Sequence, residues 1–225
     1  MGFFNTKKQK VNLEEFCRLY YDDVILNPKD ATNTEYPETF KKQITELLPE
    51  FESVSLEKIR GELRNLTFEL FALLWVHNFG IESAIKQSIF TKSYLHEKRK
   101  DDIWEGMEHY NKSVSHSILI QTGNSKDNII KKRVDLFDRH ENTYKDNEDA
   151  KYALARAINR AFSEKAYKIG CTNYFLMLAL CHKFGLGSGK EYLGPNKKAQ
   201  SGFVSAIAGM YSGMSKYFDN IEIES

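Results

Sequence analysis

Helical periodicity runs through almost the entire chain and restricts its fold more than any other feature. Apolar side chains recur every three or four residues, and the four prolines stand at positions 28, 37, 49 and 195. Because proline interrupts a helix and a half-buried strand needs alternation at every second residue, this spacing leaves long stretches for helices and few for strands. The sequence therefore predicts an all-α chain, an irregular bundle of about eight helices.

Chain length and composition predict one domain. The 225 residues, 41% of them hydrophobic, are enough for one well-filled core. We expect a flexible N-terminal segment over residues 1–10 and a single helical domain over residues 11–225. The first helix is expected to include Val11 and to stop before Pro28, and another is expected to end at Gly80. The predicted centre of the bundle consists of residues 56–78, 173–184 and 201–218.

Charge and hydropathy exclude two classes of partner. Lys and Arg number 32 against 31 Asp and Glu, a formal net charge of +1, so no global field would attract nucleic acid. No stretch approaches the roughly 18 apolar residues of a membrane span, so we expect a soluble protein without a transmembrane segment. Phe3 and Phe4, followed by lysines, leave peripheral membrane contact through the N-terminus as an open alternative to a plain tail.

The cysteines indicate a reducing compartment. Cys17, Cys171 and Cys181 are odd in number and form no C-x-x-C pair, which argues against a disulfide framework. We therefore expect a cytoplasmic location.

Two polar residues stand in the apolar run "NLTFELFALLWVHNFG". Glu69 and His77 are eight residues apart, which separates them on a helix by about 12 Å along the axis and about 80° around it. They cannot easily hold one ion together. His77 falls on the apolar stripe one turn before Gly80, where an imidazole can bond free carbonyls. We interpret His77 as a core or capping histidine and Glu69 as a glutamate at the edge of the stripe.

A second set of metal-ligating residue types shares one helix face. Glu105, His109 and His116 lie within about 40° of one another, but opposite the apolar stripe of their helix, so we interpret them as an exposed polar face. No Glu-x-x-His, H-E-x-x-H, phosphate-loop or G-x-S-x-G signature is present. We predict no cofactor. Under a metal-binding alternative the pool of ligands is Glu62, Glu69, His77, Glu105 and His109.

The last predicted helix, "AQSGFVSAIAGMYSGMSKYF", has a strip of small residues. Gly202, Ala206, Gly209 and Gly213 recur at steps of four, three and four. Each glycine costs a helix about 1 kcal/mol relative to alanine, so close approach of another helix is expected to offset that cost. The neighbouring helix belongs either to this chain or to a second copy.

These observations lead to two functional hypotheses. The first is a non-catalytic helical protein that binds protein or peptide and self-associates, with the strip as the interface. The alternative is a metal-binding protein or metal-dependent enzyme that uses Glu and His ligands from several helices.

Overall fold

The predicted all-α fold is confirmed. The computed structural model describes residues 8–26, 31–121, 126–144, 147–168, 170–186, 196–219 and 221–224. In chain order the elements are β1 (Gln9–Val11), α1 (Leu13–Tyr20), the π-helix η1 (Tyr21–Leu26), α2 (Ala31–Leu47), the 3₁₀-helix η2 (Pro49–Ser53), α3 (Leu56–Glu97), α4 (Asp101–Gln121), α5 (Lys126–Tyr144), α6 (Glu148–Phe162), α7 (Glu164–Lys168), α8 (Cys171–Phe184), α10 (Lys197–Phe218) and β2 (Ile221–Ile223).

Helix α3 is the centre of the molecule. Ser55 caps its first turn, because the Ser55 hydroxyl accepts a hydrogen bond from the Lys58 amide at 3.2 Å. Helices α4 and α6 pack along α3, and α2, α8 and α10 also contact it, which buries the run from Phe68 to Val76 on all sides. Gly80 interrupts α3 with φ 79° and ψ −179°, a conformation that essentially only glycine adopts. The predicted boundary between two helices at Gly80 is therefore confirmed.

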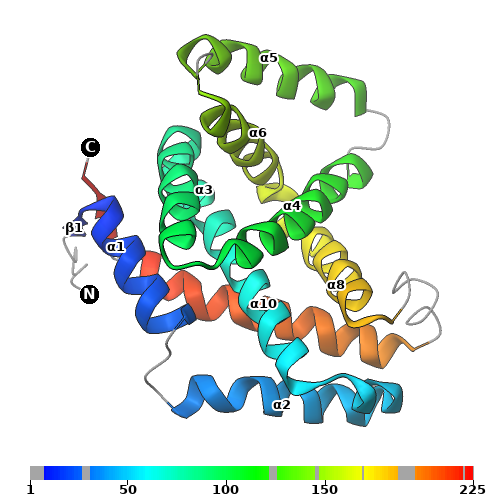
Figure 1. Cartoon of the computed structure of the whole chain (residues 1–225). Helices are drawn as coiled ribbons and strands as arrows, with labels where there is room; N and C mark the ends of the chain where they lie inside the picture. Colours follow the sequence, from blue (N-terminus) through cyan, green and yellow to red (C-terminus); the bar gives the residue numbers. More distant parts are fainter. Residues whose placement is uncertain are drawn as a thin grey trace, which may run out of the picture.

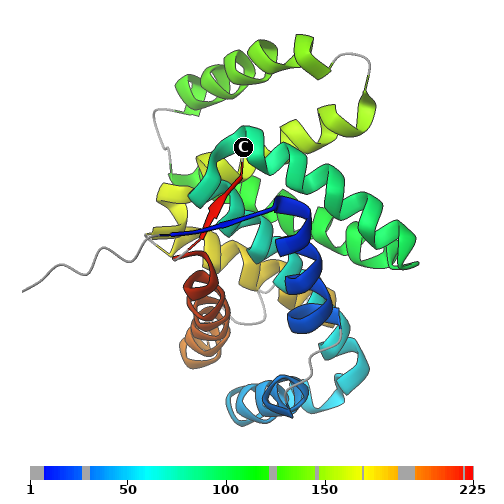
Figure 2. The ribbon, with the colours of Figure 1, turned by 90° about the vertical axis from the view of Figure 1, so that its left-hand side faces the viewer.

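The remaining helices are stacked on either side of this centre. In Figure 1, α2 lies along the bottom and α5 along the top, and the turned view in Figure 2 keeps them at the same opposite edges. Helix α10 packs against α2, α3 and α8, whereas α5 packs mainly against α6. None of the helices in the described part of the chain has the length and apolarity needed to cross a bilayer.

Aromatic side chains fill the core in two groups. Around the first half of α3, the Phe71 ring lies 4.6 Å from that of Tyr20 and 5.3 Å from that of Phe218, which joins α1 and α10 to α3. In the second group, the Phe51 ring of η2 lies 5.1 Å from the Phe184 ring of α8 in an edge-to-face arrangement. These contacts tie segments from both ends of the sequence to the central helix.

Residues near the two ends of the chain form a small parallel ladder, which Figure 2 shows as two adjacent arrows. Val11 is paired with Ile223, so the expectation that Val11 belongs to the first helix is wrong. The physical reason is the side chain of Asn12, which accepts hydrogen bonds from the amides of Glu14 and Glu15 and starts α1 after Val11. The predicted N-terminal segment of residues 1–10 overlaps β1, whereas Phe3 and Phe4 lie outside the described residues.

Candidate functional site

Glu69 is fully buried in an ion pair that joins α3 to α6. Arg160 donates from Nε to Oε1 at 2.9 Å and from Nη2 to Oε2 at 2.6 Å, and the two side chains are 0% and 1% exposed. The Asn111 amide donates a further hydrogen bond to Glu69 Oε1 at 3.2 Å. The interpretation of Glu69 as an edge residue is therefore wrong, because Arg160 neutralises its charge inside the core.

The ion pair continues into a polar network between helices. Asn159 donates to Asn111 Oδ1 at 3.1 Å, and Arg133 of α5 donates to Asn159 Oδ1 and, at 3.2 Å, to the Ser115 hydroxyl. Four helices, α3 to α6, thus meet through hydrogen-bonded polar groups rather than through apolar contacts alone. Such a network fixes their relative positions.

Sequence reasoning missed Arg160 as the partner of Glu69. Arg160 stands seven residues after Ala153 and three after Ala157, in the apolar stripe of α6, and a cation in that stripe is a signal of a buried anion elsewhere. Arg156, one turn earlier, is also only 3% exposed; it pairs with Glu108 and lies 4.0 Å above the Trp104 ring. Burial, followed by the neighbouring Arg160, lowers the pKa of Arg156 to about 10, so its charge persists at neutral pH.

Both ring nitrogens of His77 are hydrogen-bonded. Nε2 lies 3.0 Å from the Arg160 carbonyl oxygen, and Nδ1 lies 3.1 Å from the Tyr211 hydroxyl. Because a carbonyl only accepts, Nε2 carries the proton and Nδ1 accepts from Tyr211. Burial lowers the pKa of His77 below its ordinary value, which favours this neutral form. His77 is thus a satisfied histidine that connects α3, α6 and α10, although the carbonyl it caps belongs to α6.

A hollow of about 240 Å³ opens beside His77. Stacked rings of Tyr167 and Tyr211, with centroids 3.8 Å apart, form part of its wall. Lys168 pairs with Glu164 at 2.8 Å and lowers the pKa of that carboxyl. His77 has no free nitrogen and Glu164 already has a partner, so neither is available as a base, and the exposed carboxylate of Asp219 also lines the hollow.

The other metal candidates lie apart from Glu69 and His77. Glu62 accepts a hydrogen bond from the Tyr110 hydroxyl at 2.9 Å, and Glu105 is exposed. His109 lies 3.3 Å from the Ala179 carbonyl oxygen and its ring is stacked against that of His182. Among the residues that the structure describes, no three His, Cys, Asp or Glu side chains are grouped as metal ligands would be. The five candidates are therefore not brought together.

The four residues of the small-residue strip have different surroundings. A Cβ added to Gly202 would lie 2.7 Å from Leu47 Cδ1, so α2 approaches α10 closely there. Ala206 is half-buried. Around a Cβ added to Gly209 or Gly213, no atom of the described chain lies within 4 Å, and both glycines are exposed. Close packing within the chain is thus found at one end of the strip, and an intersubunit role for the rest stays a prediction.

Among the glycines that the structure describes, the closest approach of a neighbouring helix is at Gly106, between α3 and α4. A Cβ on Gly106 would overlap the Asn65 side chain, with the Asn65 Cβ at 2.9 Å. Gly106 stands between Ile103 and Tyr110 on the buried side of α4. A glycine within the apolar stripe of a helix was thus the sequence feature that could have indicated this close approach.

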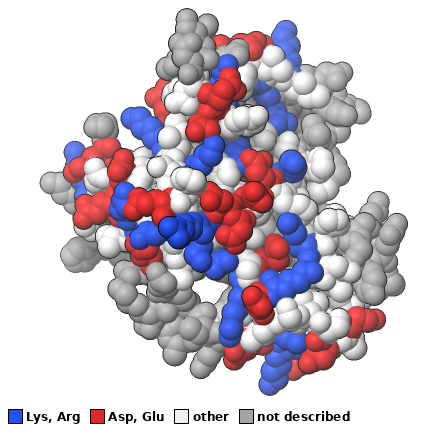
Figure 3. Space-filling model, in the orientation of Figure 1, with Lys and Arg blue, Asp and Glu red and all other residues white. Residues whose placement is uncertain are grey.

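Charges of both signs are mixed on the surface that Figure 3 draws. It shows Lys and Arg intermingled with Asp and Glu.

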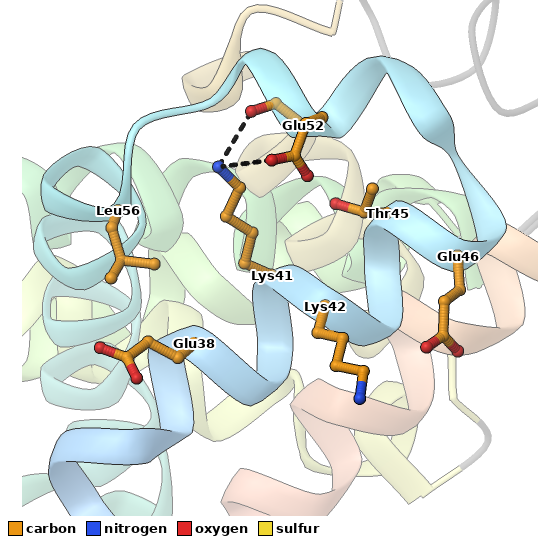
Figure 4. A pocket seen from close by; sticks show the side chains of 7 residues that line it. All are labelled: Glu38, Lys41, Lys42, Thr45, Glu46, Glu52 and Leu56. Atoms are coloured by element: carbon orange, nitrogen blue, oxygen red, sulfur yellow. Dashed lines mark hydrogen bonds and ion pairs between the residues drawn. The ribbon is translucent and has the colours of Figure 1, made fainter.

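A second hollow, of about 390 Å³, lies between α2 and η2 and is lined by charged side chains. Figure 4 shows its Lys41 directed at Glu52, whose backbone carbonyl accepts a hydrogen bond at 2.9 Å. That lysine is already engaged, so the hollow offers no free cation from Lys41.

Helix α5 has an uncovered apolar edge. None of its side chains that the structure describes is buried, and Ile130 and Val134 are 40% and 50% exposed. Phe137, at the edge of this exposed pair, is half-buried and packs in part against the core of its own chain. We call Ile130, Lys131, Val134, Phe137 and Asp138 the α5 face, because they lie on adjoining sides of one helix.

Comparison with known protein families, with curated proteins and with solved structures finds no match to this chain. Its function must therefore be inferred from the chemistry of its own residues.

Proposed function

We propose that this chain is a non-catalytic protein that acts by binding protein, and that its partner is a second copy of itself. The observation that carries the proposal is the α5 face. Helix α5 has 19 residues, and helices in proteins owe most of their stability to burial of an apolar face. With Ile130 and Val134 open to water, the described chain leaves that stabilisation incomplete. In the proposed dimer, the second copy buries these two side chains.

The state of the reactive side chains supports a non-catalytic role. Glu69 is neutralised by Arg160, and His77 uses both nitrogens. Burial raises the pKa of the Cys181 thiol to about 12 and also raises the pKa values of Cys17 and Cys171. Because the thiolate is the reactive form of cysteine, these thiols are poor nucleophiles at neutral pH.

The compartment and the excluded partners belong to the same proposal. The three cysteines are free, as suits the reducing cytoplasm in which we place the protein. A nucleic-acid surface needs clustered basic side chains; the net charge of +1 and the mixed charges on the face drawn in Figure 3 support a protein partner instead.

The test is the mass of the protein in solution. Sedimentation velocity over about 1 to 200 µM should show a monomer and dimer in exchange. Ile130→Asp places a charge on the α5 face and should raise the dissociation constant at least roughly tenfold while the fold is retained, because exposed positions tolerate substitution. Circular dichroism and urea unfolding check that retention.

Two further variants test alternative surfaces. Leu19 on α1 is 58% exposed and lies away from α5, so Leu19→Asp is the matched control and should leave the mass unchanged. Gly209→Leu tests the open end of the α10 strip in the same way. A monomeric parent would refute self-association, and a dimer disrupted by Leu19→Asp or Gly209→Leu but not by Ile130→Asp would place the interface on α1 or α10.

A further inference from the structure

The α5 face contains two residue pairs with identical spacing. Ile130 and Phe137 are seven residues apart, and so are Lys131 and Asp138. Seven residues correspond to about 20° around a helix and about 10 Å along it, so the members of each pair lie on the same side, two turns apart. One pair is apolar and the other has opposite charges.

This spacing is self-complementary when two copies of α5 run antiparallel. A twofold axis perpendicular to both helices and close to Val134 brings Ile130 opposite the Phe137 of the second copy. The same operation brings Lys131 opposite Asp138, and each contact occurs twice. The centres of the two pairings lie about half a residue on either side of Val134, so one helix register satisfies both to within about one residue, or about 1.5 Å along the axis.

A parallel arrangement lacks this match. There the twofold axis runs along the helices and places the two copies of Lys131, and likewise the two copies of Asp138, on opposite sides of the contact, so neither charge meets its opposite. Both side chains are exposed, and neither forms an ion pair or hydrogen bond with a residue that the structure describes. They are therefore available to a second copy without loss of an existing described contact.

The position of α5 leaves room for such pairing. It forms the outermost layer of the molecule in both ribbon views, with α6 beneath it. Arg133, about 100° from Val134 around the helix, anchors α5 through Asn159 and Ser115. The exposed residues of the α5 face are thus held on a defined scaffold.

We propose that α5 pairs antiparallel with α5 of a second copy across a twofold axis near Val134, with Lys131 of each copy paired to Asp138 of the other. This inference rests on the self-association proposed above and specifies its geometry. Ile130, Val134 and Phe137 supply the apolar contact, and the two ion pairs set direction and register. A single helix pair is at or below the lower end of the roughly 1,200 to 2,000 Å² that stable complexes bury, so we expect a dissociation constant of micromolar order.

Charge reversal tests the pairing. Lys131→Glu and Asp138→Lys should each raise the dissociation constant at least roughly tenfold, because each places like charges opposite one another at both contacts. The variant with both substitutions should return to within about threefold of the parent. A one-to-one mixture of the two single variants should form a heterodimer, because each then meets an opposite charge. The measurement is sedimentation velocity, with urea unfolding to confirm the fold of each variant.

Lys132→Glu is the matched control, since Lys132 is exposed on the other side of α5 and the change in charge is the same. It should leave the dissociation constant unchanged. A dimer indifferent to both single reversals would overturn the pairing and leave self-association standing. The pairing is also overturned if the single variants weaken the dimer but neither the double variant nor the mixture restores it. A monomeric parent would overturn both proposals.

Discussion

At the scale of single residues, the Glu69 and Arg160 pair holds opposite charges where water does not reach. We predict that Glu69→Gln lowers the free energy of unfolding by about 3 to 5 kcal/mol, because Arg160 would remain charged and buried without its partner. Urea unfolding at pH 7 measures this loss. A variant as stable as the parent would show that the pair is not structural.

The control for that prediction is an exposed pair. Glu38 and Arg60 lie 3.0 Å apart with side chains about half exposed, and pairs of this kind contribute between about 0 and 1 kcal/mol. Glu38→Gln should therefore change stability by less than about 1 kcal/mol.

His77 gives the protein a dependence of stability on pH. Burial lowers its pKa in the folded state, so in the unfolded chain the imidazole takes up a proton near 6.5 while the folded protein still resists it. The unfolded state then binds more protons, and stability should fall as the pH drops below 6.5 until the folded-state pKa is passed. His109, whose pKa burial also lowers, acts in the same direction.

The variant that isolates His77 is His77→Gln. A glutamine amide can donate to the Arg160 carbonyl and accept from Tyr211, but it does not titrate. Unfolding free energies at pH 7.5, 6.5 and 5.5, compared between parent and variant, should show a shallower acid loss in the variant. Parallel curves would assign the dependence to other groups, including His109.

The sequence indicated that these side chains are important, but it did not indicate fully which residues surround them. That His77 is a satisfied histidine was foreseen from its place before Gly80, whereas the depth of Glu69 was not. Angles on one helix can be calculated from spacing, but which neighbouring helix supplies Arg160 depends on packing between segments 91 residues apart.

At the scale of elements, some glycines in helices pack against a neighbouring helix, whereas others have no neighbouring helix close by in the described part of the chain. Gly106→Ala should cost about 1 to 3 kcal/mol because the added Cβ overlaps Asn65, whose own Cβ is too close to move aside easily. Gly209→Ala meets no described atom within 4 Å and should gain up to about 1 kcal/mol from helix propensity. Thermal and urea unfolding of the two variants compare the signs directly. A loss at Gly209 would reveal a packing partner at that position.

Helix boundaries were predictable where backbone chemistry is local. Gly80 and Pro49 mark breaks because their backbone conformations are unusual or restricted. The break at Ser163 is not marked in the sequence, whose helical periodicity continues over residues 148–168. There the Ser163 hydroxyl bonds the Arg160 carbonyl at 2.6 Å, and His77 bonds the same oxygen from α3. A tertiary contact thus contributes to the end of α6, and the periodicity of the sequence does not indicate such a contact.

At the scale of the whole molecule, deletions near the N-terminus should separate a dispensable segment from a structural one. Removal of residues 1–8 should leave stability unchanged, as the sequence prediction of an N-terminal segment implies. Removal of residues 1–11 deletes β1 and should cost about 1 to 2 kcal/mol, from lost ladder hydrogen bonds. Hydrogen exchange at the Glu224 amide, which donates to Val11 at 3.0 Å, should accelerate only in the longer deletion. Equal effects of both deletions would contradict this boundary.

Fold class followed from the sequence because helical periodicity is repeated in nearly every segment. The interaction surface did not, since exposure of Ile130 and Val134 depends on how α5 is placed over α6. In the sequence those two residues resemble any other apolar pair one turn apart.

The ladder between β1 and β2 also affects the order in which the protein is completed on the ribosome. Residues 9–11 are synthesised before helices α1 to α10, and residues 221–223 only after them. Strand β1 therefore has no partner until β2 has been synthesised, and the ladder closes only after α10 has emerged. A nascent chain stalled before residue 221 would present residues 9–11 unpaired, where a chaperone or protease can distinguish it from a chain in which the ladder has formed.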